Sequence, residues 1–150
     1  MAIQTVCDIF YRSVDTHRKP EHLKYKKDGA WRAISSEELR AAVEIAHDNH
    51  KHVAAHCHAL RGIENAVEAG VDSIEHCTFA DDAVLRRMAE RGTVLVPTIC
   101  AGELLFRDES VVATMPPHLL ERMSAFNDVH AAAVRRAHEL GVTIAMGTDA

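Results

Sequence analysis

The sequence lacks the features that mark membrane, secreted and nucleic-acid-binding proteins. No apolar run approaches the roughly 20 residues needed to span a bilayer, and Met1 is followed by a mixed segment rather than by a basic start and an apolar core. The basic residues form no long stripe and the formal net charge is −5, so nucleic-acid binding has little support. We therefore expect no membrane or nucleic-acid partner, and a cytoplasmic location.

The sequence also lacks paired cysteines, because Cys7, Cys57, Cys77 and Cys100 show no CxxC spacing. Without a secretory signal, we expect reduced thiols rather than disulfides. Neither a low-complexity stretch nor a second domain is found. The 150 residues suffice for one domain, and the 47% hydrophobic and 26% charged content is that of an ordinary globular protein.

Histidine, by contrast, is abundant, with 11 in 150 residues. Most of these side chains need no metal. His47, His50 and His52 lie at a predicted helix end and its exit loop, where imidazole satisfies free carbonyls. A solvated surface position is expected for five others, which are His17, His22, His118, His130 and His138. The remaining three, His56, His58 and His76, fall at predicted strand ends.

Helical and extended patterns alternate from residue 35 onwards. A capping box of Ser35 and Glu38 begins a helix expected to end near Asn49. The pattern then predicts strands at residues 53–57, 71–76, 93–98 and 142–149, helices at 59–69 and from Asp81 or Asp82 to Gly92, and a long helix from Pro116-Pro117 to Gly141.

Two segments fit this series less well. Residues 1–34 are poorly assigned, with a possible strand at 3–11 and a loop at 18–29, and residues 99–115 are predicted to form a long loop with a short helix around 103–107. Elsewhere the strand ends recur about every 20 residues, which fits successive βα units. The predicted fold class is α/β, with a parallel sheet.

Three metal-ligand residues fall where predicted strands end. His56, His76 and Asp149 each close a strand, and the carboxyl ends of parallel strands meet at one edge. Two imidazoles and a carboxylate there favour a divalent metal, most of all zinc, with positions left open for water. Asp149 is also the candidate general base, and His58 the candidate to orient substrate or stabilise an oxyanion.

Other interpretations of these residues stay open. A buried histidine is more often a core residue with one hydrogen bond, and a Thr-Asp pair after a strand is more often a turn or cap. Cys57 and Cys77 each follow a candidate ligand, so a cysteine-based enzyme is an alternative. Alternation places Cys57 toward the helices and Glu75 on the face opposite His76, which favours structural roles for both.

The segments VAAHCHA (53–59), AGVDSIEH (69–76), MAERGTVLVPT (88–98) and GVTIAMGTD (141–149) resemble the metal-dependent amidohydrolase superfamily, in its imidazolonepropionase-like and prolidase-like branch. The resemblance covers residues 35–150. It implies a (β/α)₈ barrel that hydrolyses amide or other carbon–nitrogen bonds with one or two metals. It would make His56, His76 and Asp149 the ligands on strands five, six and eight, with a small-molecule or dipeptide-like substrate near His58.

The chain departs from the family pattern at its N-terminal side. The family's strand-one HxH pair is absent before His56, and residues 3–11 offer Gln4 where two-metal members carry a bridging lysine. We therefore expect a partial TIM-type barrel, roughly strands 5 to 8 with the preceding helix, with impaired activity. The alternative is a non-catalytic half-barrel that binds metal weakly and self-associates through exposed strand edges.

Overall fold

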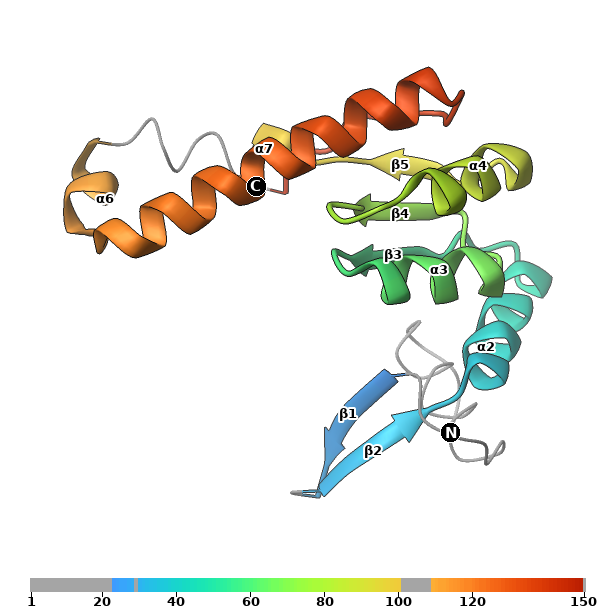
Figure 1. The fold of residues 1–150 in the computed structure, drawn as a ribbon. Helices are drawn as coiled ribbons and strands as arrows, with labels where there is room; N and C mark the ends of the chain where they lie inside the picture. Colours follow the sequence, from blue (N-terminus) through green and yellow to red (C-terminus); the bar gives the residue numbers. More distant parts are fainter. Residues whose placement is uncertain (1–22, 29, 101–108, 150) are drawn as a thin grey trace.

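The computed structural model describes residues 23–28, 30–100 and 109–149. The possible strand at residues 3–11 and the short helix around 103–107 lie outside the described residues. The elements run β1, β2, α2, β3, α3, β4, α4, β5, α6 and α7 along the chain (Figure 1). Among the described residues, none of the helices is both long and apolar enough to cross a membrane.

The N-terminal part holds an antiparallel hairpin of β1 (Leu23–Lys27) and β2 (Ala30–Ile34). The predicted loop over residues 18–29 is therefore wrong for residues 23–27. The sequence signal was the Asp28-Gly29 dipeptide, which favours a two-residue hairpin turn. Asp28 has the left-handed φ of 52° that such turns require.

Helix α2 (Ser36–Asp48) begins and ends as its sequence predicts. Ser35 Oγ accepts from the Glu38 N–H at 3.1 Å, and Glu38 Oε2 accepts from the Ser35 N–H at 2.7 Å. The C-cap is Asn49, whose side chain donates to the Ile45 carbonyl at 2.7 Å. The capping box thus satisfies two amides that the first turn leaves without helical partners.

A parallel sheet in the order β3-β4-β5 forms the centre of the molecule. The strands are β3 (Ala54–Cys57), β4 (Ser73–His76) and β5 (Val94–Val96), and they align His56 with Glu75 and Glu75 with Val96. Helices α3 (Leu60–Ala69) and α4 (Asp82–Arg91) connect them and end at Gly70 and Gly92, both left-handed. The expected α/β class and successive βα units are confirmed.

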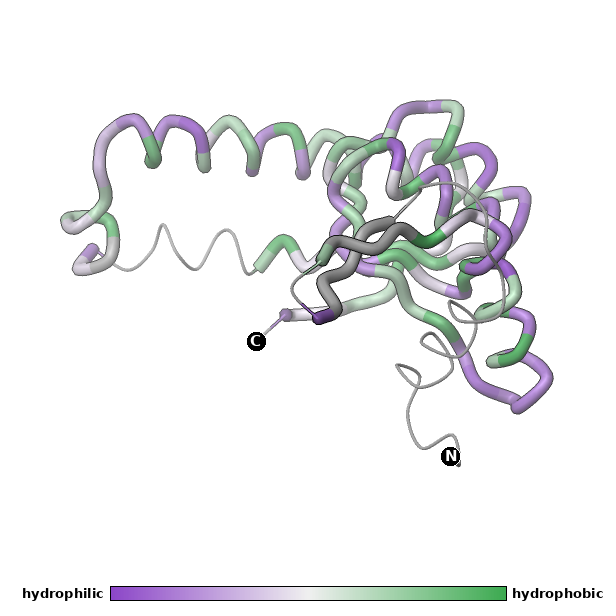
Figure 2. The backbone as a smooth tube through the Cα atoms, turned by 90° about the horizontal axis from the view of Figure 1, so that it is seen from below, coloured by the Kyte–Doolittle hydropathy of each residue, from purple (hydrophilic) through white to green (hydrophobic). Residues whose placement is uncertain are grey.

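The core lies between the sheet and these helices. Ile74 and Leu95 point from the strands into it, and Ile63, Val67 and Met88 meet them from the helices. Each of these side chains is at most 1% exposed. Figure 2 shows hydrophobic and hydrophilic residues interspersed along the elements of this body. Burial of each large apolar side chain stabilises the fold by roughly 1.5–3 kcal/mol.

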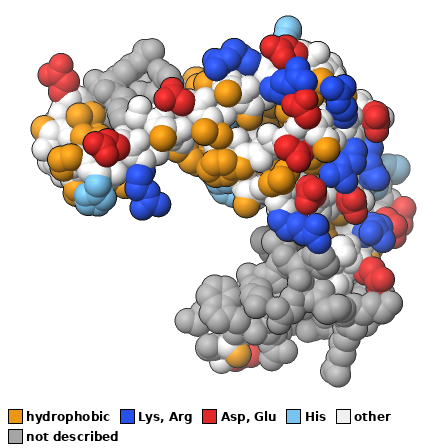
Figure 3. Space-filling view, viewed as in Figure 1, with side chains coloured by type: hydrophobic (Ala, Val, Ile, Leu, Met, Phe, Trp, Pro, Cys, Tyr) orange, Lys and Arg blue, Asp and Glu red, His pale blue; other side chains and the backbone are white. Residues whose placement is uncertain are grey.

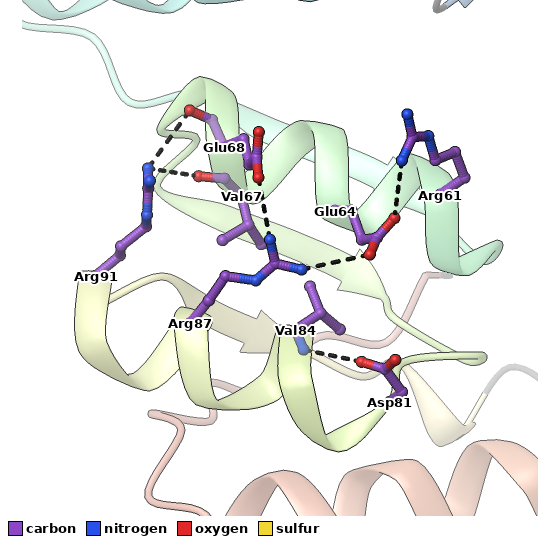
Figure 4. Close-up of polar contacts among 8 residues, drawn as sticks. All are labelled: Arg61, Glu64, Val67, Glu68, Asp81, Val84, Arg87 and Arg91. Carbon is purple, nitrogen blue, oxygen red and sulfur yellow. Dashed lines mark hydrogen bonds and ion pairs between the residues drawn. The ribbon is translucent and has the colours of Figure 1, made fainter.

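Polar contacts join α3 and α4 on the outer side of this layer (Figure 4). Arg87 contacts Glu68 at 3.0 Å and Glu64 at 3.4 Å, and Arg91 donates to the Val67 carbonyl at 3.1 Å. Arg91 thus adds a second donor to a carbonyl in the last turn of α3, which already accepts from the Gly70 N–H at 3.2 Å. These contacts fix the two helices side by side beneath the strands.

The expected strand at residues 142–149 is largely absent. Only Ile144 bridges to β5, with the Leu95 N–H donating to Thr143 O and the Ala145 N–H to Leu95 O, both at 2.9 Å. The next ladder bond would come from the nitrogen of Pro97, which carries no hydrogen. Proline therefore ends the pairing after one rung.

Helix α7 (Pro117–Glu139) begins at the predicted proline pair and packs its C-terminal half on the body through Ala137 and His130. Arg136 Nε bonds Asp82 of α4 at 2.7 Å. The N-terminal half extends beyond the sheet (Figure 1), and Figure 3 shows hydrophobic side chains along this helix. Residues 109–114, expected in a loop, form helix α6 (Glu109–Thr114).

Candidate metal centre

Three imidazoles converge at the carboxyl ends of β3 and β4. One ligand nitrogen from each of His56, His58 and His76 lies within 4.8 Å of the others. His76 Nε2 is 2.9 Å from His56 Nδ1, and the His58 ring stacks on the His76 ring with centroids 4.4 Å apart. The structure thus brings together three of the four predicted site residues.

The backbone of His76 makes this convergence possible. In the register of β3 and β4, His76 aligns with Cys57 and Glu75 with His56, so simple alternation would place His76 on the helix-facing side. His76 and Cys77 instead adopt left-handed φ values of 69° and 60°. This turn directs the His76 ring toward His56, while Cys77 remains in the core beside Met88.

Glu75 is a site neighbour whose position differs from the expected one. The register gives it the same face of the sheet as His56, and its carboxylate acts on the pKa of His76. The expectation that Glu75 and His76 lie on opposite faces assumed regular alternation up to the strand end. The left-handed backbone at His76 breaks that alternation.

Left-handed non-glycine residues cluster at this edge. His76, Cys77, Thr98 and Asp149 all have φ between 50° and 69°. Each such residue costs free energy, of order 1–3 kcal/mol, that the surrounding packing must offset, and such residues concentrate at functional sites. Their positions, after β4, after β5 and in the segment that bridges β5, support a functional edge.

Each clustered imidazole except His56 has a threonine partner. His76 Nδ1 is 2.7 Å from Thr98 Oγ1, and His58 Nδ1 is 2.9 Å from Thr78 Oγ1. Both threonines are buried. Outer-shell hydrogen bonds of this kind hold metal-ligating rings in orientation.

His130, expected at the surface, is instead buried beneath the site. Its Nε2–H donates to the His76 carbonyl at 2.9 Å, and its side chain is 6% exposed. Its ring also lies against Phe126, which contacts His58. The sequence carries only one hint, the apolar spacing of Phe126 and Val134 about His130, because the contact joins α7 to a strand more than 50 residues away.

The electrostatics of the cluster favour neutral imidazoles. Burial lowers the pKa of His76, His56 lowers it further, and Asp149 and Glu75 oppose the shift. Burial and the neighbouring His76 and His56 likewise lower the pKa of His58. Neutral imidazole is the metal-binding form, so the site favours coordination over protonation.

Asp149 lies near the cluster without joining it. Its charge raises the pKa values of His58 and His76, yet among the described residues the ligand-atom group contains the three histidines alone. Its side chain is exposed, on a segment held by a single β-bridge. Its role as ligand and base stays a prediction.

The two cysteines beside the cluster have the properties of inert thiols. Burial raises the pKa of Cys77 to about 12 and also raises that of Cys57. A nucleophilic cysteine needs a lowered pKa, because the thiolate is the reactive form. The structure therefore disfavours the cysteine-based alternative.

The donor set fits a divalent metal. Nitrogens bound tetrahedrally to one zinc ion at 2.0–2.1 Å lie about 3.3 Å apart, and the three histidine nitrogens lie within 4.8 Å of one another. Rotation of the rings would have to bring them closer to hold one ion. Imidazole donors suit zinc and several other transition metals.

Comparisons with known proteins identify the family of this chain. Residues 25–150 match the model of the amidohydrolase family. Ochratoxinase of Aspergillus niger is 36% identical over 116 residues, which is 77% of this chain and 24% of that protein, and its crystal structure superimposes with a TM-score of 0.68. The chain thus spans about a quarter of the length of this curated relative.

Two further solved structures are similar. A Xaa-Pro dipeptidase with bound methionine in its active site is 39% identical, with a TM-score of 0.66 over 79% of this chain and 29% of that one. A prolidase complexed with N-methylphosphonate-L-proline is 28% identical, with a TM-score of 0.65 over 77% of this chain and 28% of that one.

Proposed function

The chain belongs to the metal-dependent amidohydrolase superfamily, in its prolidase-like branch, and from that premise we propose that it carries part of the metal centre of an enzyme hydrolysing amide or related carbon–nitrogen bonds. The observation that carries the proposal is the convergence of His56, His58 and His76 at one strand edge. The lowered pKa values of His58 and His76 and the threonine partner of each ring support a metal site rather than a solvated surface cluster.

Each residue has a proposed part in the reaction. His56 and His76 would hold a divalent ion, zinc by preference, and Asp149 would complete the set. When bound, the ion would supply Lewis acidity, polarising a carbonyl and lowering the pKa of a water toward about 7. The Asp149 carboxylate would accept the proton that the attacking water loses. His58 would orient the substrate or stabilise developing negative charge on its oxygen.

A small amide of dipeptide type is the substrate class we propose. Two similar structures are a Xaa-Pro dipeptidase and a prolidase, and a third is ochratoxinase. In such folds the loops at the carboxyl edge determine substrate specificity. The core and the amino ends of the strands therefore do not narrow the substrate class further.

We further propose that the sheet is one sector of a (β/α)₈ barrel. The three parallel strands, the bridge at Ile144 and the covering helices support this, as does the share of each relative that the chain matches. In such a barrel β3, β4 and β5 would be strands five to seven, and the segment around Ile144 strand eight. Impaired turnover by this chain alone follows from the proposal, because the strand-one ligands would come from elsewhere.

Metal content tests the proposal directly. The purified chain is loaded with zinc, desalted and measured by elemental analysis, and hydrolysis of Xaa-Pro dipeptides is followed alongside. We expect near-stoichiometric zinc with slow turnover. Absence of retained zinc would contradict the metal centre. Zinc without hydrolysis of any dipeptide would contradict slow turnover by this chain and leave the metal centre standing.

The second candidate is a non-catalytic half-barrel that associates with itself. It is favoured by β3, which pairs on one side only among the strands the structure describes, and by Met146, which is 94% exposed. Unpaired strand edges promote association. Light scattering of the metal-loaded chain distinguishes the candidates: a stable dimer without turnover favours this one, and a monomer contradicts it.

A further inference from the structure

The geometry points to Thr98 as the residue that sets the tautomer of His76, and so makes the His76 Nε2 lone pair available to a metal. This inference rests on the proposed function, since it concerns the same site. It assigns Thr98 a positioning role, because Thr98 acts through His76 rather than on a substrate. The argument depends on where one hydroxyl proton lies.

The Thr98 hydroxyl has two close neighbours and one proton. Its Oγ1 is 2.7 Å from the Pro97 carbonyl oxygen and 2.7 Å from His76 Nδ1. A carbonyl oxygen only accepts hydrogen bonds, and a hydroxyl donates one. If the proton pointed to His76, two oxygen atoms with lone pairs would face each other at 2.7 Å, which is repulsive.

The proton therefore lies toward Pro97, and Thr98 Oγ1 accepts from His76 Nδ1–H. A neutral imidazole carries a single N–H, so His76 Nε2 holds a lone pair. That nitrogen lies 2.9 Å from His56 Nδ1. In the metal-free chain His56 Nδ1–H would donate to it, and in the metal-bound chain the same lone pair would face the ion.

Thr78 offers a matched contrast. It is buried like Thr98 and contacts His58 Nδ1 at 2.9 Å. Among the hydrogen bonds of the described residues, the Thr78 hydroxyl has no acceptor other than His58 Nδ1. Its proton can therefore point toward the ring or away from it. Thr78 therefore accommodates either tautomer of His58, whereas Thr98 accommodates one tautomer of His76.

The structure also keeps the Thr98 hydroxyl in place. Thr98 is 5% exposed, and its hydroxyl is held at the carbonyl of the preceding residue, Pro97, at 2.7 Å. The His130 ring, donating to the His76 carbonyl at 2.9 Å, holds the other side of His76. Ring and hydroxyl are thus both restrained, which is what an outer-shell partner requires.

The test measures the tautomer itself. Long-range ¹H–¹⁵N spectra of the imidazoles are recorded on the metal-free chain at pH 8, above the ordinary histidine pKa of about 6.5, with His76 assigned through its backbone. The variants are Thr98→Val, which keeps the shape but removes the acceptor, Thr98→Ser, which keeps the hydroxyl, and Thr78→Val as the matched control.

We expect the Nδ1–H tautomer of His76 in the native chain, in Thr98→Ser and in Thr78→Val. In Thr98→Val we expect a shift toward Nε2–H and about a 10- to 100-fold loss of zinc affinity, the cost typical of a lost outer-shell partner. Should Thr98→Val fail to fold, the native and Thr98→Ser spectra still decide, because they report the tautomer directly.

An Nε2–H tautomer in the native chain, or an unchanged Nδ1–H signal in folded Thr98→Val, would overturn the inference even if zinc binds normally. The expected tautomer in a chain that binds no zinc would support the inference and contradict the proposed function instead. The two failures are therefore distinguishable.

Discussion

The two ends of the parallel sheet each gather histidines, and they use them differently. At the carboxyl ends, His56, His58 and His76 face one another without a carboxylate inside the cluster. At the amino ends, Asp72 lies between His47 and His52, with its oxygens 2.8 Å and 3.3 Å from their ring nitrogens. Asp72 also accepts from the Val53 N–H at 2.7 Å.

The difference lies in what occupies the ring nitrogens. Burial alone would raise the pKa of Asp72, but hydrogen bonds from Val53, His47 and His52 outweigh it and lower the pKa to about 2. By bonding His47 of α2 and the Val53 N–H, Asp72 stabilises the packing of α2 beside the amino ends of the strands. At the other end, burial and mutual proximity lower the pKa values of His58 and His76 and leave lone pairs for a metal.

This contrast teaches that histidine content does not identify a site. Nearly equal numbers of histidines lie at both edges, yet only the carboxyl edge combines neutral rings, threonine partners and left-handed backbone. The amino edge of such folds serves stability, and the carboxyl edge serves chemistry. Four experiments would break or sharpen that division.

The largest expected effect is the loss of metal at one edge only. His56→Ala and His76→Ala should each lower zinc affinity by more than about 100-fold, beyond the usual cost of an outer-shell loss. His52→Ala, at the other edge, should leave it unchanged, since the His52 side chain is 93% exposed and pairs with Asp72 at 3.3 Å. Calorimetric titration measures all three. Equal losses in His52→Ala and His76→Ala would erase the proposed division.

Next in size is the removal of the buried His130. His130→Ala leaves the His76 carbonyl without its donor and opens a cavity, so we expect a loss of about 2–4 kcal/mol in the free energy of unfolding. His138→Ala, exposed on the same helix, should stay within about 0.5 kcal/mol of the native chain. Urea unfolding compares them. A neutral His130→Ala would mean that α7 does not support the site.

Asp72→Ala should cost less, about 1–2 kcal/mol, because the carboxylate is one-third exposed and solvent screens its pairs. Because its folded pKa lies below its unfolded one, its contribution is present above about pH 4 and is lost as pH falls toward 2. The stability difference between native and Asp72→Ala chains should shrink over that range. A difference that persists at pH 2 would show that packing, not charge, causes it.

The smallest effect concerns acidification from pH 7 to pH 5. Folded pKa values of His58, His76 and His130 lie below their ordinary value, so the unfolded chain takes up more protons and stability falls in this range. We expect a loss smaller than that of Asp72→Ala. On acidification, the free energy of unfolding of His130→Ala should fall by less than that of the native chain. Urea unfolding at both pH values measures the difference. An equal loss would assign the effect to other groups.

Much of the local structure followed from short sequence signals. The Ser35–Glu38 capping box, the helix-ending Gly70 and Gly92, and the proline pair at 116–117 all predicted boundaries that the structure confirms. Such signals act within a few residues, so no distant partner is needed to interpret them. The Asp28-Gly29 turn of the β1–β2 hairpin is an equally local signal. It was missed because the basic and polar residues around it are typical of a loop.

That three histidines meet at the carboxyl edge was predictable, but their geometry was not. The residues at strand ends identified His56, His58 and His76, because parallel strands bring their carboxyl ends to one edge. Alternation, however, would have separated His56 from His76, and only the left-handed turn at His76 reunites them. No local pattern predicts that turn.

By itself, the sequence determined the order of the βα units and which side chains reach the carboxyl edge, since periodicity and capping are properties of neighbouring residues. Only the tertiary structure decided that His130 is buried beneath His76, that Pro97 ends the ladder to Ile144, and that Thr98 meets the His76 ring. Each of these depends on contacts between segments far apart in the chain. Their free energies arise from packing and hydrogen bonding that exist only once the elements are assembled.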